Sequence, residues 1–398
     1  MRSLAVLTVT AAAFLLPSPA AAQFSEAQLA KWLKRYPKAD ANRDGRLTVA
    51  EAMAFRKTLV GAAGRGKGAP RVFEVDPRWR EDRFPEDAVC YRTPEEIAAV
   101  YAEAAGTRRP VVRYEKPADG SLRIIGTGHS FMAPGYKALP KVAEAAGLGQ
   151  PPPLTHIGGG MTGSTRYKWE QENGIFGFEG RPMPKLLASL ANAEWDVMTW
   201  GPYFNDRPEY YACWIEFGLK HNPDMRFYVS DAWPQLYQLK EPPVSEADLT
   251  ADVLRRMGEE KFETYSGIVA ELNARYGNRV FVMPTCEAMV LAAEAFHDGT
   301  LPGVEGIHQA VGGKPRSLWR DRLGHLGPGF GNLEGYVFYA TLYGRNPELI
   351  EGDAFPASEF PSRELDRRFR EIAWRAVLNN PLSGVKDSDG DGVADDRE

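Results

Sequence analysis

From residue 121 onward, short apolar runs alternate with segments of helical spacing. The apolar runs have the length of buried strands and cover residues 122–125, 154–157, 195–200, 225–229 and 279–283. The helical segments between and after them cover residues 137–147, 184–193, 209–220, 250–276, 286–296 and 333–343. Alternation of this kind is typical of a parallel sheet that is covered by helices on both faces.

The pattern therefore predicts an α/β domain over residues 121–345. Its expected architecture is a three-layer α/β/α sandwich around a five-stranded parallel sheet, of the flavodoxin-like kind. Residues 346–380 follow with an amphipathic helix that places Leu365, Phe369 and Ile372 on one face. Its other face carries many charges, which we interpret as a solvated surface.

The first 22 residues have the pattern of a secretory signal peptide. Arg2 precedes an apolar run over residues 4–16, and three alanines at 20–22 precede the expected cleavage point. We therefore expect export to the periplasm or the cell exterior. This run is too short to span a bilayer and no later run is longer, so no membrane span is predicted.

Residues 23–60 predict a small helical module around a loop rich in side-chain oxygens. The loop covers residues 40–51, with oxygen-bearing side chains at its positions 1, 3, 5, 9 and 12 and glycine at position 6. Calcium takes six to eight oxygen ligands, and a glycine at position 6 permits the sharp turn around it. The loop resembles the EF-hand family, and an acidic turn without metal is the alternative. The resemblance implies Ca²⁺ ligands at Asp40, Asn42, Asp44, Arg46, Thr48 and Glu51.

A second loop with the same spacing occupies residues 387–398. It resembles the isolated DxDxDG calcium loops of secreted proteins, and it could pair with the first loop. The resemblance implies ligands at Asp387, Asp389, Asp391, Val393, Asp395 and Glu398. Between the first loop and the α/β domain lie a glycine-rich linker at 61–70 and a connecting region at 71–120.

Composition narrows the function classes. The chain has 398 residues, 43% of them hydrophobic, which is enough for a large core. A net charge of −5 disfavours a general nucleic-acid role. The three cysteines, Cys90, Cys213 and Cys286, allow at most one disulfide, and burial as small apolar residues is the favoured interpretation.

Four blocks of the α/β domain carry residues of chemical interest. Residues 126–131 contain Ser130, residues 158–160 are three glycines, residues 201–206 contain Asn205, and residues 321–326 contain Asp321 and His325. Three blocks follow predicted strands, whose carboxyl ends meet at one edge of a parallel sheet. A serine hydroxyl becomes a strong nucleophile when an imidazole takes its proton and a carboxylate orients that imidazole.

In this order the four blocks resemble the SGNH (GDSL-like) hydrolase family over residues 121–345. The resemblance implies a nucleophile at Ser130, oxyanion donors at Gly160 and Asn205, and a base at His325 with Asp321 nearby. It also implies an ester as the substrate, either a small molecule or a polysaccharide.

The chain departs from the family pattern at three places. His129 stands where an aspartate is usual, two extra residues separate Gly201 from Asn205, and one extra residue separates Asp321 from His325. Asp206, another carboxylate or a backbone carbonyl could therefore orient His325 in place of Asp321. Trp200, Tyr203 and Trp233 lie near strand ends, where they could line a sugar-binding cleft or simply pack.

Two functions follow. The first is an exported serine hydrolase of the esterase type, acting on acyl or acetyl esters, including those of carbohydrates, with calcium-binding loops. The second is a calcium-binding scaffold or ligand-binding protein on a catalytically inactive SGNH-like fold. The distance between the Ser130 hydroxyl and the His325 ring separates the two, because only the hydrolase needs it to be short.

Overall fold

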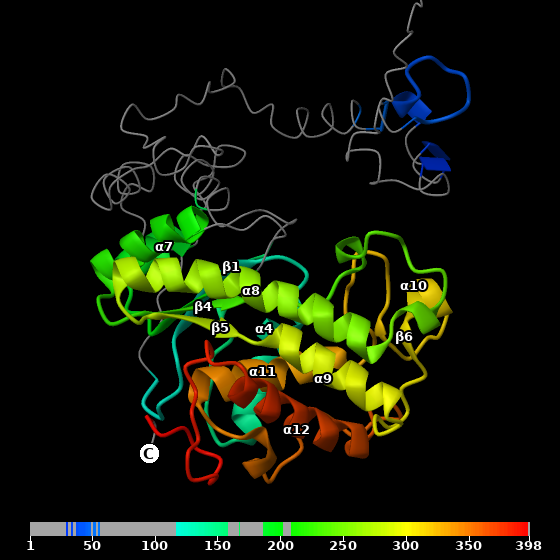
Figure 1. Ribbon diagram of the computed structural model, residues 1–398. Coiled ribbons are helices and arrows are strands. Elements are labelled where there is room, and N and C mark those ends of the chain that lie inside the picture. The colour runs from blue at the N-terminus through cyan, green and yellow to red at the C-terminus, as the bar shows by residue number, and fades with distance from the viewer. Residues whose placement is uncertain are drawn as a thin grey trace, which may run out of the picture. The chain divides into compact units, whose positions relative to one another are not determined.

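We describe the chain from a computed structural model, shown in Figure 1. It describes residues 29–30, 33–34, 37–48, 51–52, 55, 117–157, 167, 186–201 and 208–396. The chain divides into two compact units, residues 1–72 and 73–398, which we treat one at a time.

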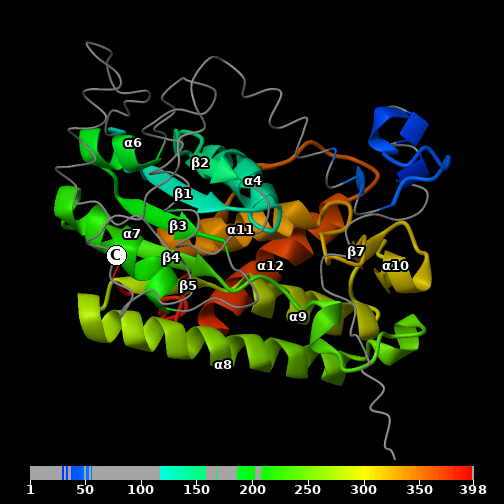
Figure 2. The ribbon, with the colours of Figure 1, turned by 90° about the horizontal axis from the view of Figure 1, so that it is seen from above.

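A five-stranded parallel sheet forms the centre of the larger unit, as predicted. The strands are β1 (Ile124–Gly128), β2 (Leu154–Ile157), β3 (Val197–Trp200), β4 (Arg226–Ser230) and β5 (Val280–Met283). Their order is β2-β1-β3-β4-β5, which can be followed across Figure 2 and is the order of flavodoxin-like folds.

Helices follow the strands in turn. They are α4 (Ala133–Ala145), α6 (Leu186–Asn192), α7 (Pro208–His221), α8 (Ala251–Tyr276), α9 (Thr285–His297), α10 (Gln309–Gly312), α11 (Phe330–Tyr343) and α12 (Arg363–Asn379). Short 3-10 turns occur at η4 (Leu236–Gln238), η5 (Glu246–Asp248) and η6 (Pro347–Leu349). Two of the longer helices begin at hydrogen-bonding caps, because Thr250 accepts the Val253 N–H and Ser362 accepts the Leu365 N–H.

The sheet separates two hydrophobic cores, which makes the fold three-layered. Ile124 contributes to a core with α4, α9, α11 and α12, whereas the next residue, Ile125, contributes to a core with α6, α7 and the second half of α8. Successive side chains of a strand point to opposite faces, so a fully apolar strand supplies both layers. Figure 1 shows α7 and α8 above the strands and α11 and α12 below them.

The sequence pattern did not predict a second, two-stranded parallel sheet between α9 and α11. It consists of β6 (Gly306–His308) and β7 (Ser317–Trp319), with α10 between them. Strands of three residues are too short for an apolar period to stand out from their surroundings. This small sheet matters because residues 321–326 follow directly after β7.

The C-terminal segment covers the outer side of β5, which is an edge strand of the large sheet. The Val282 N–H of β5 donates to the Leu382 carbonyl at 2.8 Å. Val385 and Ala394 are buried in the same core as α11 and α12. The C-terminal segment is therefore part of the folded larger unit.

The smaller unit contains a compact loop with a core of its own. Ala39, the last residue of η2 (Pro37–Ala39), is buried together with Leu47 and Ala52. Leu29, Leu33 and Phe55 pack against these three residues. The predicted signal peptide at 1–22, the linker at 61–70 and most of the connecting region at 71–120 lie outside the described residues.

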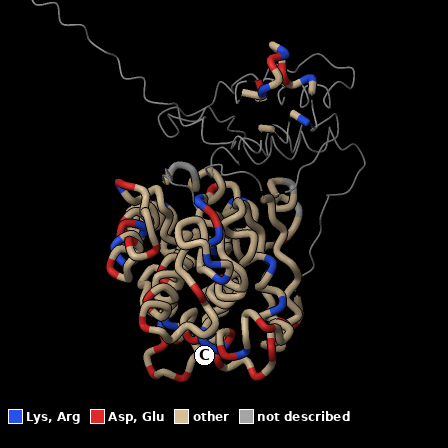
Figure 3. Tube along the Cα trace, turned by 90° about the vertical axis from the view of Figure 1, so that its right-hand side faces the viewer, with Lys and Arg blue, Asp and Glu red and all other residues tan. Residues whose placement is uncertain are grey.

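The structure also bears on membrane-spanning segments, on the cysteines and on the surface charge. Among the described residues, no helix is long and apolar enough to cross a membrane. Cys213 and Cys286 are buried and neither forms a disulfide, while Cys90 lies outside the described residues. Lysine and arginine positions are interspersed with acidic ones on the face that Figure 3 shows.

Asp231, at the carboxyl end of β4, joins that strand to the start of α9. One of its oxygens, Oδ1, accepts the Cys286 N–H at 2.8 Å and the Thr285 hydroxyl at 3.1 Å. Burial disfavours the charged form and raises the pKa of the Asp231 carboxyl from 3.8 to about 7, although these hydrogen bonds oppose the shift.

Asp231→Asn is therefore expected to stabilise the protein at pH 8 and to have a smaller effect near pH 5. A carboxyl whose folded pKa is raised loses stability as the pH rises from its unfolded pKa through its folded one. The amide keeps an acceptor oxygen and carries no charge, so it avoids a penalty on the order of 4 kcal/mol at high pH. Thermal unfolding at both pH values measures this, and an equal effect at both would contradict it.

Candidate functional site

Ser130 lies just beyond the carboxyl end of β1, in the turn that leads to α4. All five residues of β1 are buried, whereas Ser130 is exposed. Glycines are required beside it, because a Cβ atom on Gly201 would lie 2.9 Å from the Gly128 Cα atom. The ends of β1 and β3 can therefore approach closely, and the serine is presented at the sheet edge.

The structure brings Ser130 and His325 together although 195 residues separate them in the chain. The Ser130 Oγ atom lies 2.7 Å from the His325 Nε2 atom. This is hydrogen-bond distance, as transfer of the hydroxyl proton to the imidazole requires. The His325 side chain is 17% exposed, so one side of the pair remains open to solvent.

Asp321 contacts the other nitrogen of the same ring. The His325 Nδ1 atom lies 2.8 Å from Asp321 Oδ2 and 3.0 Å from Oδ1. Burial alone would raise the pKa of the Asp321 carboxyl, but hydrogen bonds from the His325 side chain and backbone outweigh it and bring the pKa below its ordinary value. The carboxylate thus stays charged beside the ring and favours the tautomer with the proton on Nδ1.

A tight turn accommodates the extra residue between Asp321 and His325. Gly324 has a φ of +86°, in the left-handed region that favours glycine, and its N–H donates to the Asp321 carbonyl at 2.8 Å. The Leu323 and His325 N–H groups both donate to Asp321 Oδ1, at 3.1 and 3.3 Å. Within the described residues the ring partner is therefore Asp321, and no backbone carbonyl takes its place.

The loop that follows β4 supports the turn at residues 321–325 through two hydrogen bonds. The Trp233 indole N–H donates to the Gly324 carbonyl, and the Gln235 amide donates to the Leu323 carbonyl at 3.3 Å. The Phe131 ring packs against both segments. Its centroid lies 5.0 Å from that of the Trp233 ring and 5.2 Å from that of the His325 ring. Trp233 is fully buried, so it supports the turn and does not line a cleft.

His129, which stands where the SGNH pattern has aspartate, lies in the turn that precedes α4. Its carbonyl accepts the Met132 and Ala133 N–H groups at 3.0 and 3.3 Å. Its ring is buried and meets Phe131 edge-on at a centroid distance of 5.0 Å. These contacts give His129 a structural role, and the carboxylate beside His325 comes from Asp321 in the loop at 321–325.

Gly160 and Asn205, and also Asp206 and Tyr203, lie outside the described residues. Trp200 is described and is buried against Tyr211 and Phe227, so it packs and does not line a cleft. The sequence did not predict the supporting roles of Phe131 and Gln235, because ring packing and hydrogen bonds between distant segments leave no local signal.

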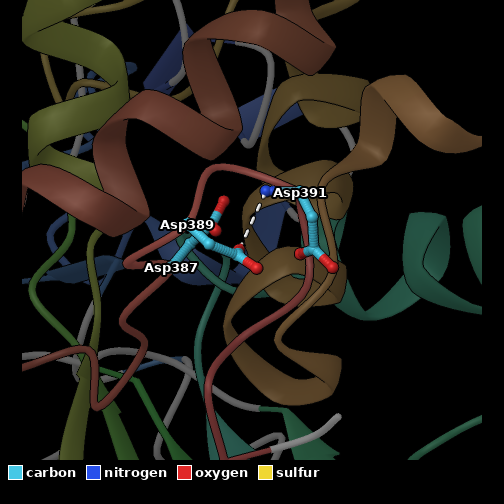
Figure 4. A group of neighbouring side chains, drawn as sticks. All are labelled: Asp387, Asp389 and Asp391. Atoms are coloured by element: carbon cyan, nitrogen blue, oxygen red, sulfur yellow. Dashed lines mark hydrogen bonds between the residues drawn. The ribbon is translucent and has the colours of Figure 1, made fainter.

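A candidate metal site lies in the C-terminal loop. One carboxylate oxygen from each of Asp387, Asp389 and Asp391 lies within 4.8 Å of the others (Figure 4). Asp395 is not part of this group, and its two oxygens accept the Ser388 N–H and hydroxyl at 2.8 and 2.7 Å. Glu398, the sixth predicted ligand, lies outside the described residues.

The two loops share their internal hydrogen bonds position by position. The glycine at position 6 donates to the aspartate at position 1, at 2.9 Å in the first loop and 3.1 Å in the second. Residue 7 donates to the aspartate at position 5, at 2.8 and 2.7 Å. Residue 5 donates to the side chain at position 3, at 3.0 and 3.2 Å. The two loops therefore have the same internal turn.

The ends of the loops differ. In the first loop Glu51 Oε2 accepts the Thr48 N–H and hydroxyl at 3.0 and 2.7 Å, and Asn42 donates to Oε1 at 3.4 Å. Hydrogen bonds from Thr48 lower the pKa of the Glu51 carboxyl. In the second loop Val393 pairs with Arg345, which ties the loop to the end of α11.

Comparisons with known proteins add little to this geometry. No protein-family model matches the chain, and no curated protein is significantly similar to it. Among solved structures, a DUF4886 family protein from Bacteroides uniformis ATCC 8492 is similar with a TM-score of 0.44 and 13% identity, over 65% of this chain and 95% of that one. The function of the site therefore has to be inferred from its own residues.

Proposed function

We propose that the protein is a serine hydrolase of the esterase type. The observation that carries the proposal is the continuous hydrogen-bonded series from Ser130 through His325 to Asp321, with distances of 2.7 and 2.8 Å. Such a series activates a serine hydroxyl, and it is found on unrelated folds that catalyse acyl transfer. The alternative of an inactive scaffold is less well supported, because its expected sign was a serine beyond reach of the histidine.

The reaction proceeds in two half-reactions. His325 Nε2 takes the proton of the Ser130 hydroxyl while Oγ attacks the ester carbonyl carbon, and Asp321 stabilises the imidazolium that forms. His325 then gives the proton to the leaving alcohol, and an acyl group stays on Ser130. Water, deprotonated by the same nitrogen, then attacks the acyl carbon, the bond to Ser130 Oγ breaks, and His325 returns the proton to Oγ as the acid is released.

The oxyanion needs donors that lie close to Ser130. We assign one of them to the backbone N–H of Ser130, and the others to the Gly160 N–H and the Asn205 side-chain amide. The substrate class is an acyl or acetyl ester, either small or part of a carbohydrate. The open side of the catalytic pair is consistent with a bulky alcohol portion, since Ser130 is exposed at the edge of the sheet.

The proposal is tested with short-chain p-nitrophenyl esters and with an acetylated polysaccharide. The purified full chain should hydrolyse the aryl esters and should be labelled covalently by a fluorophosphonate, which requires an activated serine. Absence of both hydrolysis and labelling would favour the scaffold.

Trp233→Phe should lower kcat roughly tenfold and leave KM unchanged. Phenylalanine keeps the ring that packs on Phe131 but loses the N–H bonded to Gly324, so the His325 turn is held less firmly. Trp195→Phe is the matched control, because it removes a comparable indole bond, 2.9 Å to Ser189, from the other core. Equal kcat values for the two variants would rule out a positioning role for Trp233.

Calcium is the ion that we assign to both loops. The shared hydrogen-bond pattern and the three converging carboxylates of the second loop support this, since Ca²⁺ favours several carboxylate and carbonyl oxygens. Asp40, Asn42, Asp44, Arg46, Thr48 and Glu51 would hold it in the first loop. The expected signal peptide would deliver the chain to a compartment where calcium is plentiful.

Calcium is expected to raise the melting temperature of the larger unit by about 5 to 10 °C when it is present at a hundredfold excess over its Kd. The loop pairs with α11, so its ion stabilises the folded state. Asp387→Asn should abolish the shift, whereas Asp44→Asn, the matched change in the first loop, should leave it. Identical melting curves with calcium and with chelator would count against the assignment.

A further inference from the structure

Two neighbouring helices follow the two members of the proposed catalytic pair. Ser130 lies in the turn that leads to α4, and His325 lies in the loop that leads to α11. The two helices pack against each other so closely that a Cβ atom on Gly135 of α4 would lie 2.7 Å from the Phe338 ring of α11. The position of α4 relative to α11 therefore affects the distance between the serine hydroxyl and the imidazole.

The first turn of α4 has no side-chain cap from its own segment. The N-cap residue, Met132, makes no side-chain hydrogen bond to the turn, and Pro134 has no N–H to donate. The buried Gly135 N–H instead donates to the Oε2 atom of Glu334 at 2.8 Å. A side chain of α11 thus supplies the acceptor that the start of α4 lacks.

Glu334 is an expensive residue at this position. It is 3% exposed, and its other carboxyl oxygen, Oε1, is buried with no hydrogen-bond partner among the described residues. Burial raises the pKa of the Glu334 carboxyl well above its ordinary value, and the bond from Gly135 opposes this only in part. An unpartnered buried oxygen lowers stability, so the carboxyl calls for a reason other than stability.

The same turn of α4 is held to the sheet by a separate contact. The Tyr136 hydroxyl lies 2.7 Å from the Thr199 Oγ1 atom of β3. This bond fixes α4 against the strand, whereas the bond from Gly135 to Glu334 fixes it against α11. Of these two bonds, only the second relates the turn that carries Ser130 to the helix that follows His325.

We propose that Glu334 is a positioning residue for the Ser130–His325 pair. By accepting the Gly135 N–H, it holds the start of α4 in place against α11, and it acts on the serine through this backbone contact. Its catalytic consequence rests on the proposed function, because a precise distance between the hydroxyl and the imidazole matters only if the serine is a nucleophile.

Glu334→Leu tests the role, because leucine fills a similar volume and cannot accept the Gly135 N–H. We expect kcat for p-nitrophenyl acetate to fall roughly tenfold with KM unchanged, since the exposed site still binds the ester. Glu334→Gln keeps an acceptor oxygen and should retain kcat within about twofold. An unchanged kcat in the leucine variant, or an equal loss in both variants, would overturn the proposal.

Asn222→Leu is the matched control for the loss of a buried acceptor. The Asn222 Oδ1 atom accepts the Trp195 N–H at 2.8 Å, and Trp195 belongs to the other core. This variant should melt at a lower temperature and keep its kcat. A loss of kcat equal to that of Glu334→Leu would mean that kcat follows general stability, and the positioning role would be wrong. If circular dichroism shows that Glu334→Leu does not fold, Glu334→Met replaces it, because a thioether is only a weak acceptor.

Amide hydrogen exchange separates this inference from the proposed function. Exchange at residues 130–133, which excludes Gly135 itself, should become roughly tenfold faster in Glu334→Leu and stay unchanged in Asn222→Leu. Absence of hydrolysis and of fluorophosphonate labelling in the unaltered chain would contradict the proposed function and leave this exchange result to decide the role of Glu334. Unchanged exchange at residues 130–133 in Glu334→Leu would overturn the inference, whatever the activity of the protein.

Discussion

Replacing Ser130 with alanine is expected to reduce the rate of ester hydrolysis roughly 10⁴- to 10⁶-fold. Oγ is the atom that becomes acylated, so no neighbouring group can take its place. The loss should fall on kcat, because the exposed site can still bind the ester. Initial rates with p-nitrophenyl acetate measure it, and mass spectrometry after fluorophosphonate treatment measures labelling.

Ser358→Ala provides the control for this change. Ser358 is also exposed, but its hydroxyl donates to the Pro361 carbonyl at 2.9 Å and lies outside the series. This variant should keep full activity and full labelling. If Ser130→Ala hydrolysed esters at the rate of the unaltered chain, the proposed nucleophile would be wrong, whatever the activity of the protein.

Asp321→Asn is expected to lower kcat by roughly 10³- to 10⁴-fold with little change in KM. An asparagine amide can present its N–H₂ group to His325 Nδ1, which then must accept, so the ring proton moves to Nε2. The ring can then no longer take the Ser130 proton. The Asp321 carboxylate faces Nδ1 at 2.8 Å, which is why this substitution acts through the tautomer.

Asp353→Asn is a suitable control, because Asp353 pairs with Arg363 on the surface at 3.0 Å and contacts no member of the series. Its kcat should match that of the unaltered chain. A kcat for Asp321→Asn within a few fold of the unaltered value would show that another group orients His325. Steady-state kinetics over a range of pH values distinguishes a tautomer effect from a general loss of folded protein.

The sheet could be predicted from the sequence because its signals are local. The run Val280–Met283, for example, consists of four apolar residues, three of them buried and one half-buried. The order of the helices between the strands then leaves few topologies to consider. Ser130 could be predicted in the same way, since the glycines before it mark the end of β1.

The support of His325 could not be predicted in this way. The spacing from Asp321 to His325 looked unfavourable because it was compared with a fixed pattern, whereas the fit depends on the positive φ of Gly324. The bond from Trp233 to that glycine spans 91 residues. The loop at residues 321–326 comes after β7, and the strands β6 and β7 have only three residues each. Strands of this length are too short to show the alternation of apolar and polar residues.

The contact between Val282 and Leu382 has a consequence for the behaviour of the protein in solution. An edge strand with free N–H and C=O groups is a template on which another chain can add. The C-terminal segment reaches that edge at Leu382. Further along, the segment is held by hydrogen bonds from the Asn346 N–H to the Gly392 carbonyl and from the Ala394 N–H to the Gly344 carbonyl, both 2.8 Å long. Removing the chain from residue 380 onward is therefore expected to expose the edge of β5 and to favour edge-to-edge association of chains.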